Sequence, residues 1–350
     1  MKKTISVICV LILLLCGCST AKPPQDDAAD APDEPQVEYR TLVIDENKAL
    51  YSYNDMETDL ETMSLAYKDI THLDIIGSTP DGRNIYDMVI GDYNAPEHVI
   101  IHASIHAREY MTTKLVMKQL AYYLNALNSN TGEYNGIPYS ELFGNVALHI
   151  IPMVNPDGVS ISQYGLSGLN NDEVRDSVNR IAESAGFTDF SQWKANANGV
   201  DLNRNYDALW DEYSGSAHPS PERYKGEYPG SEPETKALID VTTKYPVVRT
   251  ISYHTFGQVV YWYFGQSGDL YNKSAEFAQS LSDITGYALD SDYQNLDPAG
   301  YKDWAISKLG IPGVTIEVGY GSNPVPDVQF DGIWERNKDV WAGCLYNIKY

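Results

Sequence analysis

The sequence has few basic residues for its size. Among its 350 residues, 25 lysines and arginines stand against 48 aspartates and glutamates, which gives a formal net charge of −23 at pH 7. A nucleic-acid partner is not expected, because such binding needs Lys and Arg to neutralise phosphates. A polybasic patch for anionic lipid is equally excluded. The acidic excess is typical of a well-solvated extracellular surface on a chain long enough to bury a sizeable core.

Cysteine is also scarce, with four in the whole chain. Cys9, Cys16 and Cys18 lie in or just after the first apolar stretch, so only Cys344 belongs to the remaining sequence. A single cysteine has no intrachain partner, which excludes a disulfide framework. We expect Cys344 to pack as a small apolar side chain in a C-terminal helix rather than to act as a catalytic thiol.

The first eighteen residues have the pattern of an export signal. Lys2 and Lys3 form a positive start, and residues 5–15 form an apolar stretch too short to span a bilayer comfortably. The stretch ends in LCGC at residues 15–18, which resembles a bacterial lipobox. This resemblance implies cleavage before Cys18, lipid attachment to Cys18, and an extracytoplasmic protein anchored to the bacterial cell membrane. A plain signal peptide is the alternative.

The rest of the chain divides into a tether and one domain. Residues 19–44 are rich in proline, alanine and acid and show no apolar periodicity. Such a segment cannot bury enough surface to offset its ordering entropy, so we expect it to be disordered. Residues 45–350 alternate between helical and strand patterns, with no second linker and no internal repeat. The sequence therefore predicts a signal peptide over 1–18, a tether over 19–44 and one folded domain over 45–350.

The alternating pattern predicts an α/β domain, with a mixed central sheet sandwiched by helices. Helices are expected over 55–67, 112–128, 233–243, 270–285, 301–309 and 328–348. Strands are expected over 73–76, 84–90, 98–103, 146–152, 247–253 and 314–318, with a turn at 80–82. Functional sites in open α/β sheets gather at the carboxyl ends of the strands, and the motifs below mostly fall at such ends.

A His-x-x-Glu pair, His106 and Glu109, directly follows the strand expected over 98–103. Because the chain turns there into a helix, the two side chains can point at one place. Imidazole nitrogen and carboxylate oxygen are both good zinc ligands. The pair alone is weak evidence, since a surface histidine near a glutamate at a helix N-terminus is more common.

Three further blocks make this pattern specific. His106-Ala107-Arg108-Glu109 is followed in order by GVDLNRN at 199–205, SYH at 252–254 and TIEVG at 315–319. Together these blocks resemble the carboxypeptidase A family of zinc metallocarboxypeptidases, over roughly residues 51–350. The resemblance implies the single-domain metallocarboxypeptidase fold, hydrolase activity on peptides, and one zinc ion per chain bound by His106, Glu109 and His254.

The same resemblance implies further roles. Glu317 would be the catalytic base, which takes a proton from the attacking water and passes it to the leaving amine. Asp201 would accept a hydrogen bond from the first zinc histidine and orient it. Lys194 follows Trp193 where digestive members of the family have an arginine, so Lys194 would face the oxyanion. Residues that match the family's substrate-binding positions are Arg108, Asn203 and Arg204, and the last two would hold a free carboxylate.

Lys302 matches the bottom of the family's specificity pocket, where a lysine favours an acidic side chain. With GYKDW at 300–304 and WKAN at 193–196, the chain most resembles the bacterial branch acting on γ-D-glutamyl-diaminopimelate bonds in cell-wall peptides. Three alternatives stay open: a general carboxypeptidase that trims acidic C-terminal residues, a zinc deacylase, and an inactive binding module. The family's mobile tyrosine matches Asn295, with Tyr293 two residues away, so this role is unassigned.

Overall fold

The computed structural model describes residues 42–294 and 296–350, which belong to one compact unit. The expected signal peptide, the lipidation site Cys18, residues 19–41 of the expected tether and Asn295 lie outside the described residues. The packed domain extends back to Leu42, whose backbone N–H donates to Asn125 Oδ1 at 3.2 Å, and to the buried Ile44. Within the described part, we find no helix of the length and apolarity needed to cross a membrane.

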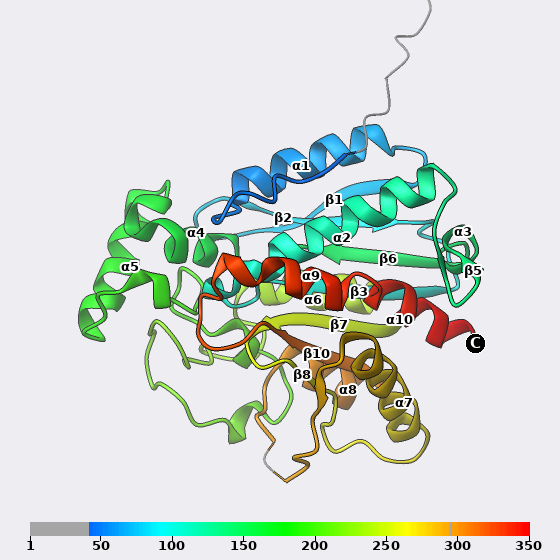
Figure 1. Ribbon diagram of the computed structural model, residues 1–350. Helices are drawn as coiled ribbons and strands as arrows, with labels where there is room; N and C mark the ends of the chain where they lie inside the picture. Colours follow the sequence, from blue (N-terminus) through cyan, green and yellow to red (C-terminus); the bar gives the residue numbers. More distant parts are fainter. Residues whose placement is uncertain (1–41, 295) are drawn as a thin grey trace, which may run out of the picture. The chain divides into compact units, whose positions relative to one another are not determined.

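A mixed eight-stranded sheet forms the centre of this unit, in the order β1-β2-β6-β3-β7-β10-β8-β9 (Figure 1). Its strands are β1 (Thr71–Ser78), β2 (Asn84–Ile90), β3 (Glu97–Ala103), β6 (Val146–Ile151), β7 (Val247–Thr255), β8 (Val259–Tyr261), β9 (Ala288–Leu289) and β10 (Gly313–Val318). The central strands β6, β3, β7 and β10 run parallel to one another. The pairs β1–β2, β2–β6 and β10–β8 are antiparallel, and the edge strand β9 runs parallel to β8. The parallel strands are apolar and almost continuously buried, as expected when helices cover both faces.

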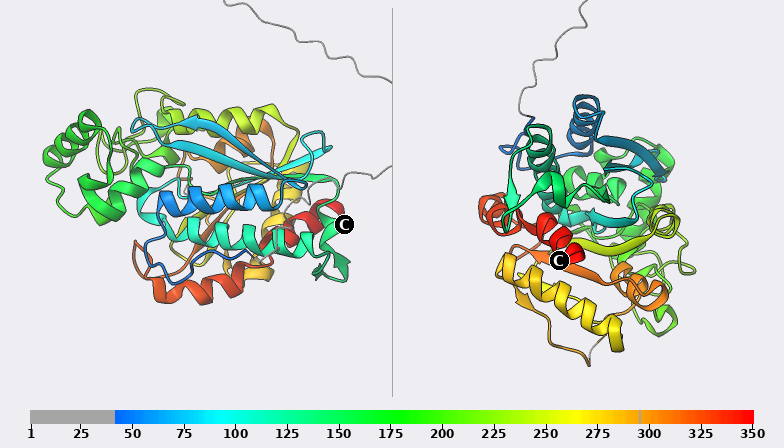
Figure 2. Two further views of the ribbon diagram at one scale, coloured as in Figure 1. Left: turned by 90° about the horizontal axis from the view of Figure 1, so that it is seen from above. Right: turned by 90° about the vertical axis from the view of Figure 1, so that its right-hand side faces the viewer.

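Two helical layers cover the sheet. The helices are α1 (Tyr53–Ala66), α2 (Met111–Asn128), α3 (Tyr139–Leu142), α4 (Pro156–Tyr164), α5 (Asp172–Ser184), α6 (Pro233–Lys244), α7 (Gly268–Thr285), α8 (Tyr301–Leu309), α9 (Phe330–Asn337) and α10 (Val340–Lys349). One core joins the sheet to α1, α2, α7, α9 and α10, and a second core joins its other face to α6 and α8. In the right-hand view of Figure 2 the sheet lies between α2 and α10 on one side and α8 on the other.

Most predicted elements are present, with their ends shifted by at most two residues. The mixed sheet between helices is confirmed, and so is the burial of Cys344 in α10. The prediction missed α4 and α5, which lie together on the left of Figure 1 around a small third core that contains Trp193. Asn155 begins α4, because its side chain accepts from the backbone N–H of Gly158 at 3.0 Å.

The single helix predicted over 328–348 is wrong, because the chain breaks there into α9 and α10. Long-range contacts satisfy the backbone at the break. The carbonyl of Asn337 accepts from Gln119 Nε2 at 2.8 Å, and the carbonyl of Lys338 accepts from the Tyr123 hydroxyl at 2.7 Å. These side-chain donors, which belong to α2, replace the helical N–H groups that a continuous helix would supply. The apolar pattern of the segment does not contain this information.

Candidate metal centre and active site

The first two predicted metal ligands lie on a sharp turn after β3. Ser104 takes the left-handed backbone conformation there, with φ of 48°. Its backbone N–H donates to Thr112 Oγ1 at 3.0 Å, and its hydroxyl lies 2.7 Å from Thr113 Oγ1. A non-glycine residue adopts this conformation only when its surroundings hold it. The turn leads into a short 3-10 helix over Ala107–Glu109, which directs His106 and Glu109 to the carboxyl edge of the sheet.

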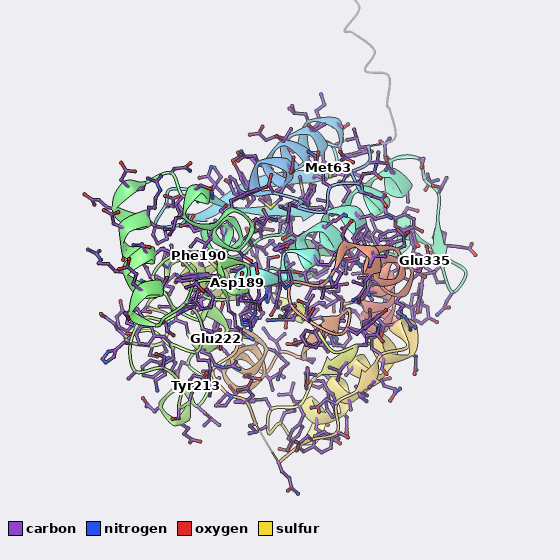
Figure 3. The ribbon with its side chains drawn as sticks, turned by 60° about the vertical axis from the view of Figure 1, so that its left-hand side comes forward. Met63, Asp189, Phe190, Tyr213, Glu222 and Glu335 are labelled. Carbon is purple, nitrogen blue, oxygen red and sulfur yellow. The ribbon has the colours of Figure 1, made fainter. Side chains whose placement is uncertain are left out.

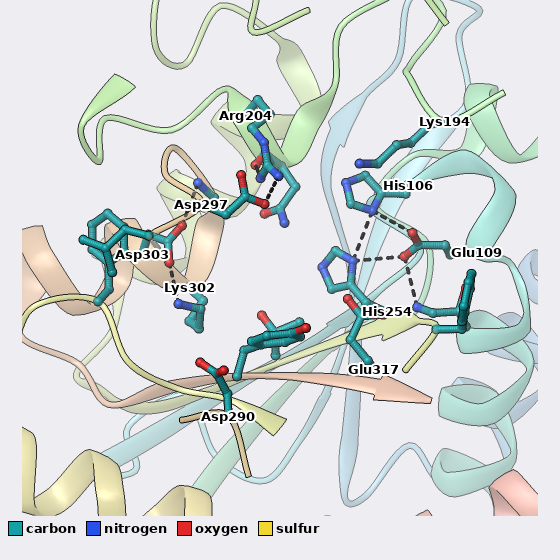
Figure 4. Close-up of a pocket in the computed structure, with 18 of the residues that line it drawn as sticks. His106, Glu109, Lys194, Arg204, His254, Asp290, Asp297, Lys302, Asp303 and Glu317 are labelled. Carbon is teal, nitrogen blue, oxygen red and sulfur yellow. Dashed lines mark hydrogen bonds and ion pairs between the residues drawn. The ribbon is translucent and has the colours of Figure 1, made fainter. Parts of the chain in front are cut away.

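His254, near the carboxyl end of β7, completes a cluster of three buried donors (Figure 4). Glu109 bridges the two histidines: its Oε1 lies 2.9 Å from His106 Nδ1 and its Oε2 lies 3.0 Å from His254 Nδ1. The two Nδ1 atoms lie 3.1 Å apart. The three donor groups therefore converge on one point, although 145 residues separate Glu109 from His254.

The donor set fits a zinc ion. The Nδ1 atoms of His106 and His254 lie 3.1 Å apart, and each lies within 3.0 Å of an oxygen of Glu109, so one small cation between them can reach all three groups. Burial alone would raise the pKa of Glu109, but His106 and His254 outweigh this effect and hold that pKa far below its ordinary value. Glu109 is thus an ionised carboxylate, and two nitrogens with one carboxylate oxygen are the usual protein ligands of catalytic zinc.

Asp201 supports His106 from behind. His106 Nε2 donates to Asp201 Oδ1 at 3.1 Å, which leaves the Nδ1 lone pair directed at the metal position. The other oxygen of Asp201 lies 3.2 Å from Lys194 Nζ. Burial would raise the pKa of Asp201, but the charges of Lys194 and His106 outweigh it and hold that pKa well below its usual range. The fully buried Asp201 is therefore an ionised acceptor that fixes the tautomer of His106.

Glu317 lies beside the metal donors through strand pairing. β10 runs parallel to β7, and Glu317 is directly opposite His254 in their register. Within residues 42–294 and 296–350, its Oε2 is buried and has no hydrogen-bond partner. Burial, reinforced by the charge of Glu109, raises the pKa of Glu317 to about 8, and a bound dication would oppose that rise. A carboxylate without a protein partner beside the metal position is available to exchange a proton.

A pocket of about 550 Å³ opens from these groups. Its lining brings together the metal donors, Glu317 and five of the other predicted site residues, which are Arg108, Lys194, Asn203, Arg204 and Lys302. Asp201 lies behind His106 rather than in the pocket wall. Four of the lining residues, Arg108, Lys194, Arg204 and Lys302, are cations. Figure 4 shows Lys194 beside His106, and Arg204 and Lys302 away from the metal donors. The arrangement can therefore receive an anionic substrate beside a metal ion.

Two of these cations rest on the segment between α5 and α6. Arg108 donates to the carbonyl of Gln192 at 2.9 Å and to Glu222 at 3.2 Å. Arg204 donates to the carbonyl of Asn203 at 2.7 Å and lies 5.0 Å from the centre of the Tyr213 ring. Figure 3 shows Tyr213 and Glu222 on this same segment. Backbone carbonyls and side chains of the segment thus hold both guanidinium groups at the pocket wall.

Several pocket residues were not predicted from the sequence. Asp303 lies next to Lys302 in the chain and forms an ion pair with it at 2.5 Å. Tyr261 lies on β8, opposite Thr315 of β10, and is 40% exposed in the pocket. Asp290 and Asp297 also line the pocket, from the segment that joins β9 to α8. Adjacency to Lys302 was a signal for Asp303, whereas the other three belong to no recognisable motif.

The buried donor set, the neighbouring carboxylate and the open pocket define a zinc-dependent hydrolase at the edge of an α/β sheet. A comparison with protein families specifies it further. The chain belongs to the zinc carboxypeptidase family, peptidase M14, whose model matches residues 56–340. It is therefore a metallopeptidase that acts on peptides, and the predicted enzyme class and zinc cofactor are confirmed.

Two bacterial relatives cover most of the chain. Gamma-D-glutamyl-L-diamino acid endopeptidase 1 of Lysinibacillus sphaericus is 33% identical over 298 residues, which cover 85% of this chain and 72% of that protein. The uncharacterized protein YqgT of Bacillus subtilis is 32% identical over 280 residues, which cover 78% and 71%. The predicted resemblance to the γ-D-glutamyl-diamino acid branch of the family is thus confirmed at the level of sequence similarity.

Solved structures confirm the fold. The thrombin activatable fibrinolysis inhibitor matches with a TM-score of 0.66 at 22% identity, over 85% of this chain and 74% of that one. Carboxypeptidase A from Helicoverpa armigera matches with a TM-score of 0.65 at 19% identity, over 86% and 75%. These identities are low, so the two structures bear on the architecture alone.

Proposed function

We propose that this enzyme hydrolyses the γ-D-glutamyl-diaminopimelate bond of cell-wall peptides. The observation that carries the proposal is the placement of Arg204 and Lys302 in one pocket with the metal donors. Diaminopimelate carries two carboxyl groups, one at each end of its carbon chain. Arg204 would bind the carboxylate next to the scissile bond, and Lys302 would bind the distal one. The similarity to the Lysinibacillus sphaericus endopeptidase supports this choice of substrate.

The residues around the donors divide the reaction between them. Bound zinc would polarise the scissile carbonyl and make water more acidic. Glu317 would accept a proton at its unpartnered Oε2 from the attacking water and then deliver it to the leaving nitrogen. Lys194, which lines the pocket beside His106, would stabilise the negative charge that develops on the carbonyl oxygen. Arg204 would hold the substrate carboxylate and so fix the position of the scissile bond.

A general carboxypeptidase that trims acidic C-terminal residues is the second candidate. The same pair, Arg204 and Lys302, would receive the two carboxylates of a C-terminal glutamate. The experiment incubates residues 19–350, loaded with zinc, with L-Ala-γ-D-Glu-meso-diaminopimelate and with a peptide that ends in glutamate. Mass spectrometry identifies the products, and the Glu317→Gln variant is the control.

The three possible results of this experiment lead to different conclusions. Release of diaminopimelate by the wild type alone supports the cell-wall peptidase. Loss of only the C-terminal glutamate supports the second candidate. Zinc binding without cleavage of either substrate contradicts both and favours a deacylase or a binding module.

We also propose that the enzyme is exported and anchored by lipid at Cys18, with residues 19–41 as part of the tether. The lipobox-like LCGC at residues 15–18 supports this localisation. A single acyl chain gives only weak, reversible membrane binding, so stable anchoring would need more than one chain. The test expresses the full chain and Cys18→Ala in bacteria. Mass spectrometry is expected to detect lipid on the wild type and none on Cys18→Ala, and cell fractionation is expected to find only the wild type with the membrane. Unchanged lipid attachment would contradict it.

A further inference from the structure

The far end of the pocket holds an ion pair rather than an isolated lysine. Lys302 Nζ lies 2.5 Å from Asp303 Oδ1 and donates to the carbonyl of Tyr263 at 3.3 Å. The other oxygen of Asp303 accepts from the backbone N–H of Gly300 at 3.1 Å. Both oxygens of Asp303 are thus engaged, and its charge offsets that of Lys302. The ammonium of Lys302 has three N–H donors, so one donor remains for a ligand.

A second carboxylate, that of Asp290, faces the same pocket. Its backbone is fixed, since its N–H donates to Val260 at 2.9 Å and its carbonyl accepts from Trp262 Nε1 at 3.1 Å. Asp290 Oδ1 accepts from the backbone N–H of Asp292 at 3.1 Å. In the part of the chain that the structure describes, no Lys, Arg or His side chain forms an ion pair with Asp290. Figure 4 shows Asp290 on the same side of the pocket as Lys302, away from the metal donors.

The wall between these charges is aromatic. Tyr263 and Phe264 line the pocket with Lys302 and Asp290, and Lys302 Nζ lies 5.5 Å from the centre of the Phe264 ring. The far end thus offers one donor from Lys302, the carboxylate of Asp290, which has no cationic partner among the described residues, and an apolar surface. A glutamate side chain would meet Lys302 but bring a second negative charge close to Asp290. A side chain that carries a carboxylate and an ammonium at the end of a methylene chain complements all three features.

We propose that Asp290 is a specificity-determining residue, whose carboxylate binds the ammonium at the distal end of the substrate side chain while Lys302 binds the adjacent carboxylate. The pocket then selects a zwitterionic diamino-dicarboxylic residue over a simple dicarboxylic one. This inference rests on the proposed function, because it takes diaminopimelate as the residue that enters the pocket.

The test compares two peptides that differ by one group. One is L-Ala-γ-D-Glu-meso-diaminopimelate, and the other replaces diaminopimelate by 2-aminopimelate, which keeps the distal carboxylate but lacks the distal ammonium. The wild type is expected to prefer the first peptide by about 10-fold or more in kcat/KM, as a charge-assisted hydrogen bond implies. Asp290→Asn is expected to reduce this preference below about 3-fold, mainly by raising KM for the first peptide.

Further variants and one further substrate separate the outcomes. Asp176→Asn, an exposed substitution on α5 with the same change of charge, is expected to keep the wild-type preference. Asp290→Asn is expected to cleave a peptide that ends in glutamate a few-fold better, because a repulsive charge is removed. Asp292 also lines the pocket, so loss of preference in Asp292→Asn but not in Asp290→Asn would overturn the assignment to Asp290.

Two outcomes distinguish a wrong role for Asp290 from a wrong substrate for the enzyme. If the wild type cleaves both peptides with equal kcat/KM, a cell-wall peptidase remains and the role of Asp290 is overturned. If it cleaves neither but still trims the peptide that ends in glutamate, the proposed function fails and the inference fails with it.

Discussion

Arg204 donates from Nη2 to the carboxylate of Asp297 across the mouth of the pocket. The two partners differ in environment, because the side chain of Asp297 is 72% exposed whereas that of Arg204 is 11% exposed. Asp297 therefore places a carboxylate of the protein on the group that the proposed function assigns to the carboxylate of the substrate. A bound substrate and Asp297 compete for the same guanidinium group.

This competition makes Asp297→Asn a variant with improved binding. The neutral amide pairs more weakly with Arg204, so the substrate displaces it at lower cost. Exposed ion pairs contribute about 0.2–1 kcal/mol, which corresponds to a KM lowered by up to about 5-fold with kcat nearly unchanged. Steady-state kinetics on the diaminopimelate peptide measures this effect. A higher KM in Asp297→Asn would show instead that Asp297 assists substrate binding.

Glu317→Gln separates proton transfer from metal binding. Among the described residues, Glu317 Oε2 forms no hydrogen bond, so it does not hold any metal donor in place. The variant is therefore expected to retain one zinc per chain. Loss of the proton acceptor is expected to lower kcat by about 10²–10⁴-fold. Zinc content by elemental analysis and kcat on the same preparation provide the measurement. His254→Ala is the matched control, which is expected to lose both zinc and activity. Full activity in Glu317→Gln would exclude this residue as the base.

Lys194→Met tests stabilisation of the oxyanion. Removing one such group typically costs about 10²–10³-fold in kcat. We expect KM to change little, because the charge acts on the transition state, and we expect Lys194→Arg to recover most of the activity. Since Lys194 also lies 3.2 Å from Asp201, zinc affinity must be measured in parallel. A rise in KM with unchanged kcat would assign Lys194 to substrate binding.

Glu234 makes the stability of the fold depend on pH. Burial raises the pKa of Glu234 to about 8, and its Oε2 accepts from Asn196 at 3.2 Å. Because the folded protein retains this proton where the unfolded chain loses it, stability falls as pH rises from about 4.5 to about 8. The slope from this one group reaches about 1.4 kcal/mol per pH unit. Glu234→Gln is expected to flatten the decline, measured as the free energy of unfolding at pH 5 and pH 8.

The control for this experiment is Glu276→Gln, an exposed position on α7. It is expected to leave the pH dependence of stability as in the wild type. An equally steep decline in Glu234→Gln would show that another group binds the proton.

The sequence predicted the zinc ligands because the chemistry that they perform restricts them to a few residue types in fixed blocks. His106 and Glu109 lie on one turn, and His254 and Glu317 end neighbouring central strands whose β-branched residues mark them clearly. The acidic residues that balance the charges of Lys302 and Arg204 could not be predicted from the sequence in the same way. Asp290 and Asp297 belong to a segment between β9 and α8 without periodicity, and only the tertiary fold brings them to Lys302 and Arg204.

The same limit explains the C-terminal break. The pattern of residues 328–348 is helical throughout, but hydrogen bonds from Gln119 and Tyr123 of α2 compete with the helix at Asn337 and Lys338. These donors are more than 200 positions away in the chain. Local propensity cannot reveal a competitor that only tertiary packing supplies.

The pairing of β7 with β10 has a consequence for how such an enzyme can change. Glu317 and His254 are neighbours on one ladder of backbone hydrogen bonds, so their spacing is set by the sheet and not by any loop. Lys302, Asp303, Asp290 and Asp297, in contrast, all lie between β8 and β10 in the chain. Substitutions in that one stretch can therefore give the enzyme a new substrate while the spacing of base and metal ligand stays constant.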